Sequence, residues 1–201
     1  GSPLRVITER QVSALQTYLD ETSPEQYSVT QAYSYSAPTL ESALDKLRDE
    51  NVGQVVMLPL YPQYSATSTA PLLDQLGCYF QSRRDSLQVS YARSYFNHSQ
   101  YIGALAKSVK QYWAEHGQAE ILLMSFHGIP QSFADKGDPY PQECEQTAKL
   151  LAQDLGLQQG QWQISFQSRL GRAKWLEPST SDSVELLGQK KLSSVQVICP
   201  G

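Results

Sequence analysis

The residues best placed to do chemistry lie at the end of an apolar run near the middle of the chain. Residues 121–126 (ILLMSF) run into His127, and Gly128 and Pro130 then interrupt the pattern. A short apolar run followed by turn residues is typical of a buried parallel strand. Ligands bind beyond the carboxyl ends of such strands, so His127 is predicted to face a site, where an imidazole can act as a base or a metal ligand. The alternative is a structural histidine that makes a hydrogen bond.

A second segment combines groups that suit a flat ligand. Residues 58–69 (LPLYPQYSATST) follow a predicted strand and place prolines, aromatic rings and hydroxyls in one short loop. Such a loop fits an apolar ligand with polar edges. The alternative is a β-to-α loop in which Ser68 or Thr69 caps the next helix and the tyrosines cover the rim of the core.

Two more segments follow the central run. Residues 167–169 (QSR) come directly after another predicted strand, and Trp175 lies a few positions later. Polar side chains at a strand end can grip a carboxylate, and a tryptophan can pack on a ring. The alternative is a surface loop in which Trp175 fills a gap. Residues 135–141 (DKGDPYP) predict a turn, and an acidic lid is the less favoured interpretation.

The elements that must position these residues alternate between apolar strands and amphipathic helices, which predicts an α/β fold with parallel sheets. In the first half, helices are expected near 8–19, at 40–50 and from about 70, with strands near 27–33, at 54–58 and near 87–91. A helix over 99–116 leads into the second half, where strands at 121–126, 161–166 and 195–198 alternate with helices at 143–155 and 181–190. We expect two similar lobes, 1–98 and 118–201, joined by a helix at 99–117, with a cleft between them.

Composition excludes several classes of protein. The chain has 201 residues, 40% hydrophobic and 18% charged, with a net charge of −4, and its sequence shows no basic stripe with interleaved aromatic residues, which argues against a nucleic-acid partner. Its longest apolar runs are too short to cross a bilayer, and its N-terminus does not have the pattern of a signal peptide, so a cytoplasmic location is expected. Cys78, Cys144 and Cys199 form no C-x-x-C pair and predict neither a disulfide framework nor a zinc or iron–sulfur site.

Taken together and in this order, the segments resemble ferrochelatase, the class II chelatase family that inserts ferrous iron into a porphyrin, and their variants resemble its proteobacterial branch. The matching segments are residues 1–4 (GSPL), 58–65 (LPLYPQYS), 125–130 (SFHGIP), 137–141 (GDPYP), 166–169 (FQSR), 175–176 (WL) and 199–201 (CPG). Each is weak by itself, but the ordered set spans the chain and is specific. The resemblance implies two Rossmann-like, flavodoxin-like lobes that enclose a porphyrin cleft.

The resemblance also implies roles for individual residues. It matches His127 to the family histidine that binds the metal or accepts the pyrrole protons, and a neutral imidazole suits both tasks. Aromatic walls would hold the distorted macrocycle, and an amide and a hydroxyl would hold a propionate. The residues that would bind the porphyrin in these ways are Tyr61, Tyr64, Ser65, Gln167, Ser168 and Trp175.

The activity that the resemblance implies is that of a lyase in haem biosynthesis, which inserts Fe²⁺ into protoporphyrin IX, forms protohaem and releases two protons. Its partners would be the porphyrin and ferrous iron, the latter as substrate, with no organic cofactor and no iron–sulfur cluster. Two alternatives stay open, a cobalt chelatase of the same fold acting on an earlier tetrapyrrole and a non-catalytic porphyrin-binding fragment. The preference for protoporphyrin or coproporphyrin, the oligomeric state and a peripheral membrane contact are open as well.

Two features of the family have no counterpart in these 201 residues. The family's opening strand would precede Gly1, and the acidic partner of its histidine would follow the Cys-Pro-Gly turn. No carboxylate of this sequence matches that glutamate. We therefore expect the chain to be the central part of a longer enzyme and to be inactive by itself.

Overall fold

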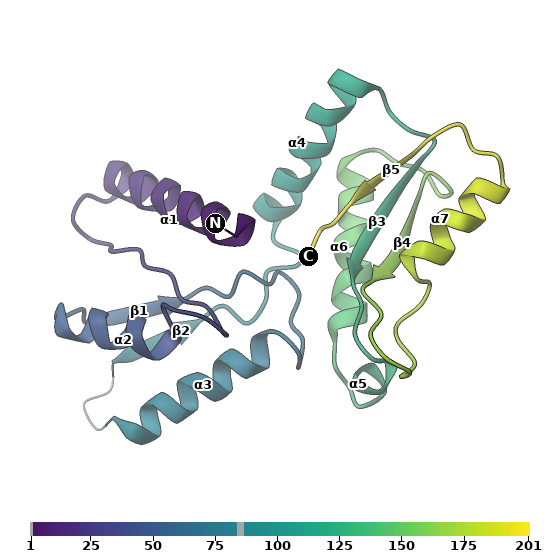
Figure 1. Ribbon diagram of the computed structural model, residues 1–201. Helices are drawn as coiled ribbons and strands as arrows, with labels where there is room; N and C mark the ends of the chain where they lie inside the picture. The colour runs from purple at the N-terminus through teal and green to yellow at the C-terminus, as the bar shows by residue number, and fades with distance from the viewer. Residues whose placement is uncertain (1, 84–86) are drawn as a thin grey trace. The chain divides into compact units, whose positions relative to one another are not determined.

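A computed structural model describes residues 2–83 and 87–201, which divide into two compact units (Figure 1). The first unit comprises residues 1–57 and 71–90, and the second comprises residues 58–70 and 91–201. Gly1, which begins the GSPL segment, lies outside the described residues. The predicted connecting helix and the loop 58–69 both belong to the second unit in this division, whereas the lobe boundaries 1–98 and 118–201 stay a prediction.

In the first unit, two of its helices pack against a two-stranded sheet. Its elements are α1 (Pro3–Thr22), α2 (Leu40–Asp49), β1 (Gln54–Met57), most of α3 (Thr69–Ser82) and β2 (Gln88–Tyr91), with β1 beside β2. Thr39 caps α2 by accepting the Ser42 N–H at 3.2 Å. The apolar stripe of α2 is buried against β1 and α3, in a core of Leu40, Leu44, Leu47, Val55, Leu76 and Tyr79. The predicted helix and strand at 40–58 are thus confirmed.

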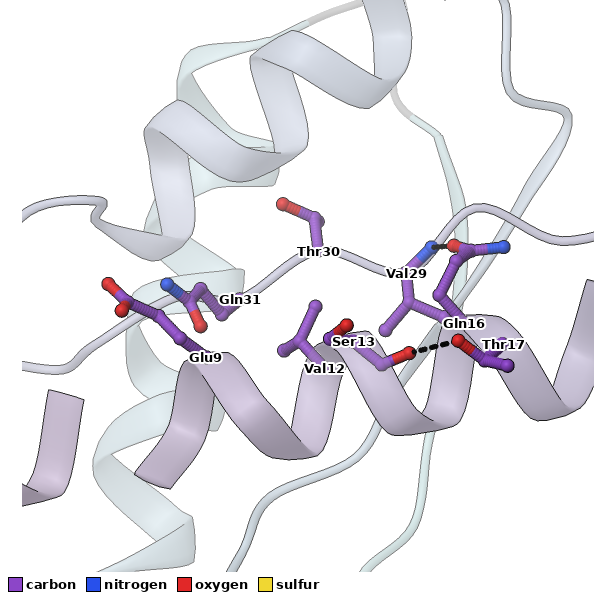
Figure 2. A pocket seen from close by; sticks show the side chains of 8 residues that line it. All are labelled: Glu9, Val12, Ser13, Gln16, Thr17, Val29, Thr30 and Gln31. Carbon is purple, nitrogen blue, oxygen red and sulfur yellow. Dashed lines mark hydrogen bonds between the residues drawn. The ribbon is translucent and has the colours of Figure 1, made fainter. Parts of the chain in front are cut away.

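The predicted strand near residues 27–33 is wrong. The segment is extended but joins no strand ladder among the described residues. The Val29 N–H instead donates to Oε1 of Gln16 on α1 at 2.7 Å, and the Tyr33 N–H donates to the Pro38 carbonyl at 2.8 Å. Figure 2 shows Val29, Thr30 and Gln31 of this segment beside α1. A cavity of about 430 Å³ is lined by these residues and by residues of α1. Contacts from a helix and a turn therefore replace the strand partner that the sequence pattern predicts.

The second unit is built on a parallel three-stranded sheet of order β4-β3-β5. Its elements are α4 (Ser99–His116), β3 (Ile121–His127), α5 (Gln131–Asp135), α6 (Tyr140–Asp154), β4 (Trp162–Gln167), α7 (Thr180–Gln189) and β5 (Val195–Ile198). This confirms the predicted alternation of strands and helices, and only the short α5 was not predicted. Gly117, with φ of 78°, ends α4 as expected from its position.

Helices cover both faces of this sheet (Figure 1). On one face, α4 and α6 pack against alternate residues of β3, namely Leu122, Met124 and Phe126, and the exposed fraction of Phe126 is 0%. On the other face lies α7, whose Thr180 hydroxyl makes hydrogen bonds with Ser125 Oγ at 2.8 Å and Ser165 Oγ at 2.9 Å. The central strand is therefore buried along its length and can emerge only at its ends.

No helix within the ranges 2–83 and 87–201 is long and apolar enough to cross a membrane. The two longest, α1 with 20 residues and α4 with 18, both carry several charged side chains.

The hydroxyl cluster under α7 gives a test of this packing. Thr180→Val removes the partner of two buried serine hydroxyls, so the free energy of unfolding should fall by about 1–3 kcal/mol in urea denaturation of the complete gene product. The matched control is Thr22→Val, since the Thr22 hydroxyl is exposed and bonds only within α1. Equal stability of the two variants would contradict the described packing.

Candidate active site

His127 is the last residue of β3 and emerges from the sheet where the buried strand ends. Its side chain is exposed, whereas Phe126 and Gly128 on either side are buried. The strand register pairs His127 with Gln167 of β4, and the Gly128 N–H donates to the Gln167 carbonyl at 2.7 Å. The backbone on both sides of the imidazole is thus fixed, while the ring itself is accessible.

The backbone at Gly128 lies too close to its neighbours for any side chain. A Cβ atom there would lie 2.7 Å from the Gln167 carbonyl oxygen and 3.4 Å from Cε3 of Trp175. Trp175 is held beside it, because its Nε1 donates to the Leu170 carbonyl at 3.0 Å. The structure therefore brings Trp175 next to the backbone of His127 and Gly128. The Trp175 side chain is partly buried, so it also fills space, as the structural alternative expects.

Gln167 and Ser168 lie at the same carboxyl edge, at the end of β4. Ser168 is exposed and has a φ of 69°, a left-handed conformation that is uncommon for a residue with a side chain. The Gln167 amide nitrogen lies 3.9 Å from the sulfur of Cys199, which follows β5. Arg169 turns towards α7 and pairs with Asp182 at 3.3 Å. One edge of the sheet thus gathers His127, Gln167, Ser168 and Trp175.

The loop 58–69 is fastened to the start of α6 by two buried carboxylates, Asp138 and Glu143, which we call the carboxylate clamp. Oε2 of Glu143 accepts the Tyr64 N–H at 2.7 Å. Oδ2 of Asp138 accepts the Ser65 hydroxyl at 2.9 Å and the Ala66 N–H at 2.8 Å. The clamp therefore satisfies two backbone donors that lie in a segment without regular structure.

Gln63 fastens the same loop at a second place. Its side chain is 2% exposed, and its amide nitrogen donates to Thr147 of α6 at 3.1 Å and to the Pro200 carbonyl at 3.2 Å. A Cβ atom at Gly201 would lie 2.8 Å from Oε1 of Gln63. The Tyr101 hydroxyl of α4 also donates to the Pro200 carbonyl. The loop, α6 and the residues after β5 are thus joined through one buried amide.

The clamp's two charges are balanced in different ways. Glu143 pairs with Arg93 at 3.1 Å, and the guanidinium of Arg93 also lies 4.2 Å from the ring centroid of Tyr64. Among the residues that the structure describes, no basic side chain lies within 4.0 Å of Asp138, although its exposed fraction is only 7%. Asp138 is stabilised by hydrogen-bond donors instead, including the Tyr140 N–H at 3.0 Å to Oδ1, where α6 begins.

Tyr140 connects the clamp to the strand that ends on His127. Its side chain is buried in the same core as Phe126, the residue before His127, and this burial raises the pKa of the Tyr140 phenol well above its usual value. Burial likewise raises the pKa of the neighbouring Cys144 thiol. Both groups therefore stay protonated and neutral near pH 7.

The remaining predictions for these segments have mixed outcomes. Tyr61 is 42% exposed, whereas Ser65 is buried and its hydroxyl also contacts that of Thr67. The alternative interpretation of this loop, in which Ser68 or Thr69 caps the next helix, is not seen for Thr69. The Ser65 carbonyl accepts the first N–H groups of α3, and the buried Thr69 hydroxyl has no hydrogen-bond partner among the described residues. The turn at 135–141 is confirmed, but Asp138 is buried in the protein and does not belong to an exposed acidic lid.

Sequence reasoning missed the polar residues that fasten the loop: Gln63, Arg93, Asp138, Glu143 and Thr147. One signal was present, since an aspartate just before a helix start is a common cap, and this one precedes Pro139 and Tyr140. The loop residues that bond to Asp138 and Glu143 could not be predicted from the sequence, because they lie more than 70 positions away along the chain.

Two cavities of the described chain lie away from this edge. Neither the cavity beside α1 nor a second one of about 310 Å³ beside α4 and α6 is lined by a predicted site residue. Within the described ranges, no three His, Cys, Asp or Glu side chains lie close enough together to hold a metal ion.

Comparisons with known proteins agree on one family. A profile described as Ferrochelatase matches residues 1–201. This chain belongs to the ferrochelatase family. Among its relatives are ferrochelatase 1 of Shewanella oneidensis, 46% identical over 200 residues, and the ferrochelatase of Aromatoleum aromaticum, 44% identical over 201 residues. A ferrochelatase of Escherichia coli O9:H4 is 43% identical. Each alignment covers 100% of this chain but only 60%, 55% and 61% of the respective relative.

A solved structure supports the fold of this ferrochelatase-family chain. This chain is similar to the structure of SirB from Bacillus subtilis with Fe³⁺, with a TM-score of 0.60 and 16% sequence identity. The match covers 93% of this chain and 68% of that one. At this identity the likeness confirms the predicted α/β class and carries no further inference.

The tight contact behind His127 gives a second test. Gly128→Ala places a methyl group against the Gln167 backbone, so the free energy of unfolding should fall by about 1–3 kcal/mol, measured by urea denaturation. The control is Gly103→Ala on α4, where a Cβ atom meets nothing within 4 Å and alanine favours the helix. A Gly128→Ala protein as stable as the wild type would contradict the close approach of β3 and β4.

Proposed function

We propose that the protein inserts ferrous iron into a porphyrin, with protoporphyrin IX as the substrate, protohaem as the product and two protons released. The proposal makes it a lyase of haem biosynthesis. The observation that carries it is an accessible imidazole at the carboxyl end of the central strand, in a chain that the ferrochelatase profile matches throughout. The chain spans about 60% of the length of the curated relatives, so we propose the activity for the complete gene product.

The chemistry needs one group that does two things. Metallation removes two N–H protons from the macrocycle and delivers a divalent cation to the four nitrogens. A neutral imidazole accepts a proton near pH 7 and also binds borderline divalent metals. His127 suits this role because the buried residues on either side of it fix its backbone, so that only the side-chain rotamer has to be ordered when substrate binds.

The neighbouring groups suit the edges and faces of a porphyrin. We assign the Gln167 amide and the Ser168 hydroxyl to a propionate, since both can donate hydrogen bonds from the edge where His127 emerges. We assign Tyr61, Tyr64 and Trp175 to the macrocycle faces, as aromatic rings pack well on a flat π-system. Ser65 is engaged with Asp138, which supports a role in holding the loop alongside its predicted substrate contact.

The remaining expectations are part of the same proposal. The iron is a substrate, and we propose neither an organic cofactor nor an iron–sulfur cluster. We also propose a cytoplasmic enzyme, without a commitment on oligomeric state or membrane contact.

Spectroscopic titration of the complete gene product tests the function. Adding protoporphyrin and then Fe²⁺ without oxygen should produce the spectrum of haem with repeated turnover. Turnover with Co²⁺ alone, on an earlier tetrapyrrole, would favour the cobalt chelatase. Porphyrin binding without turnover by either metal would favour a binding protein.

The histidine assignment has its own test. His127→Ala should lower the rate of iron insertion by about 10²–10⁴-fold, because a base that is also a metal ligand is lost, and porphyrin affinity should change little. His116→Ala at the end of α4 is the matched control, since it removes an exposed imidazole outside this edge. Near-normal turnover by the His127 variant would refute the assignment.

A further inference from the structure

Asp138 is a buried charge for which the proposed chemistry has no use. Its exposed fraction is 7%, and burial of an ionised carboxylate is unfavourable unless strong hydrogen bonds stabilise it. It receives three: from the Ser65 hydroxyl, the Ala66 N–H and the Tyr140 N–H. A residue of this kind is retained either for stability or because it holds something in place.

The pattern of donors requires a carboxylate. Both oxygens of Asp138 face an N–H group, Oδ2 that of Ala66 and Oδ1 that of Tyr140. An asparagine has the same shape but must turn its NH₂ group towards one of these N–H donors, which would break that hydrogen bond. Hydrogen bonds to a charged group are also stronger than those to a neutral one.

The two sides of Asp138 belong to different parts of the candidate site. Ser65 and Ala66 belong to the loop that carries Tyr61 and Tyr64, and they are 73 and 72 residues from Asp138 along the chain. On the other side, Tyr140 begins α6, and its side chain is buried in the same core as Phe126, the residue before His127. The chain of contacts therefore runs from the loop through one carboxylate to the strand end that presents the imidazole.

We propose that Asp138 is a positioning residue, which sets the loop 58–69 relative to His127 so that the aromatic side chains of the loop, Tyr61 and Tyr64, meet the porphyrin. This inference rests on the proposed function. Asp138 touches neither substrate nor metal and acts through Ser65 and the loop backbone. Its loss should therefore weaken porphyrin recognition while the chemistry at His127 continues.

The decisive variant is Asp138→Asn in the complete gene product, assayed for iron insertion and for protoporphyrin binding by fluorescence quenching. We expect the KM for porphyrin to rise about tenfold or more, as hydrogen bonds to a buried charge are lost, with the KM for Fe²⁺ and kcat nearly unchanged. Asp135→Asn is the matched control, because its exposed carboxylate accepts a hydrogen bond from Gln131 on α5 and from no other described residue. It should behave as the wild type.

A merely structural role would give a different result. It would lower kcat and the melting temperature with an unchanged porphyrin KM, and that outcome would overturn the proposal. Because the Ser65 hydroxyl bonds to Asp138 as well as to Thr67, the loss of porphyrin affinity in Ser65→Ala/Asp138→Asn should be smaller than the sum of the two single losses. Additive losses would also overturn it. Ser65→Ala by itself removes one of the three hydrogen bonds to Asp138, together with the Ser65 contacts to Thr67, and should raise the porphyrin KM about threefold. It therefore serves if Asp138→Asn does not fold.

The binding measurement separates this inference from the proposed function. If the wild type binds porphyrin but inserts no iron, the proposed function fails. A tenfold weaker porphyrin affinity of Asp138→Asn would then still support the positioning role. Unchanged affinity would overturn that role as well.

Discussion

Asp138 and Glu143 accept the backbone N–H groups of Ala66 and Tyr64, and a loop with no regular hydrogen bonding of its own depends on these contacts. Both carboxylates are buried at the start of α6, where one is balanced by Arg93 and the other by N–H donors. Buried charges of this kind tolerate few alternative arrangements, since each lost partner leaves an unsatisfied group. The loop is therefore held in one conformation without forming a helix or strand.

The part of the chain that leads from β3 into α6 also presents His127. The central strand is covered by helices on both faces, so its carboxyl end is the place where a side chain can leave the core while its backbone stays fixed. The hydrogen bond from Gly128 to Gln167 and the packing of Trp175 then leave no room for a side chain at position 128. Rigidity behind the histidine and accessibility in front of it have the same cause, the end of a buried strand.

The sequence was a good guide wherever structure is set by neighbours along the chain. The bounds of α4 and β5, and the position of His127 at a strand end, follow from periodicity and turn residues. It was a poor guide at residues 27–33, where Gln16 takes a backbone donor that the β pattern assigns to a strand. It also missed the clamp, because Glu143 meets Tyr64 across 79 residues and no local pattern encodes that contact.

The clamp is tested most directly by amide hydrogen exchange in the complete gene product, read at single residues and corrected for intrinsic rates. If the two carboxylates hold the loop, the Tyr64 and Ala66 amides should exchange at least about tenfold more slowly than those of Ser168 and Arg169 in the exposed loop after β4. Equal exchange at these four amides would contradict a loop fixed by buried carboxylates.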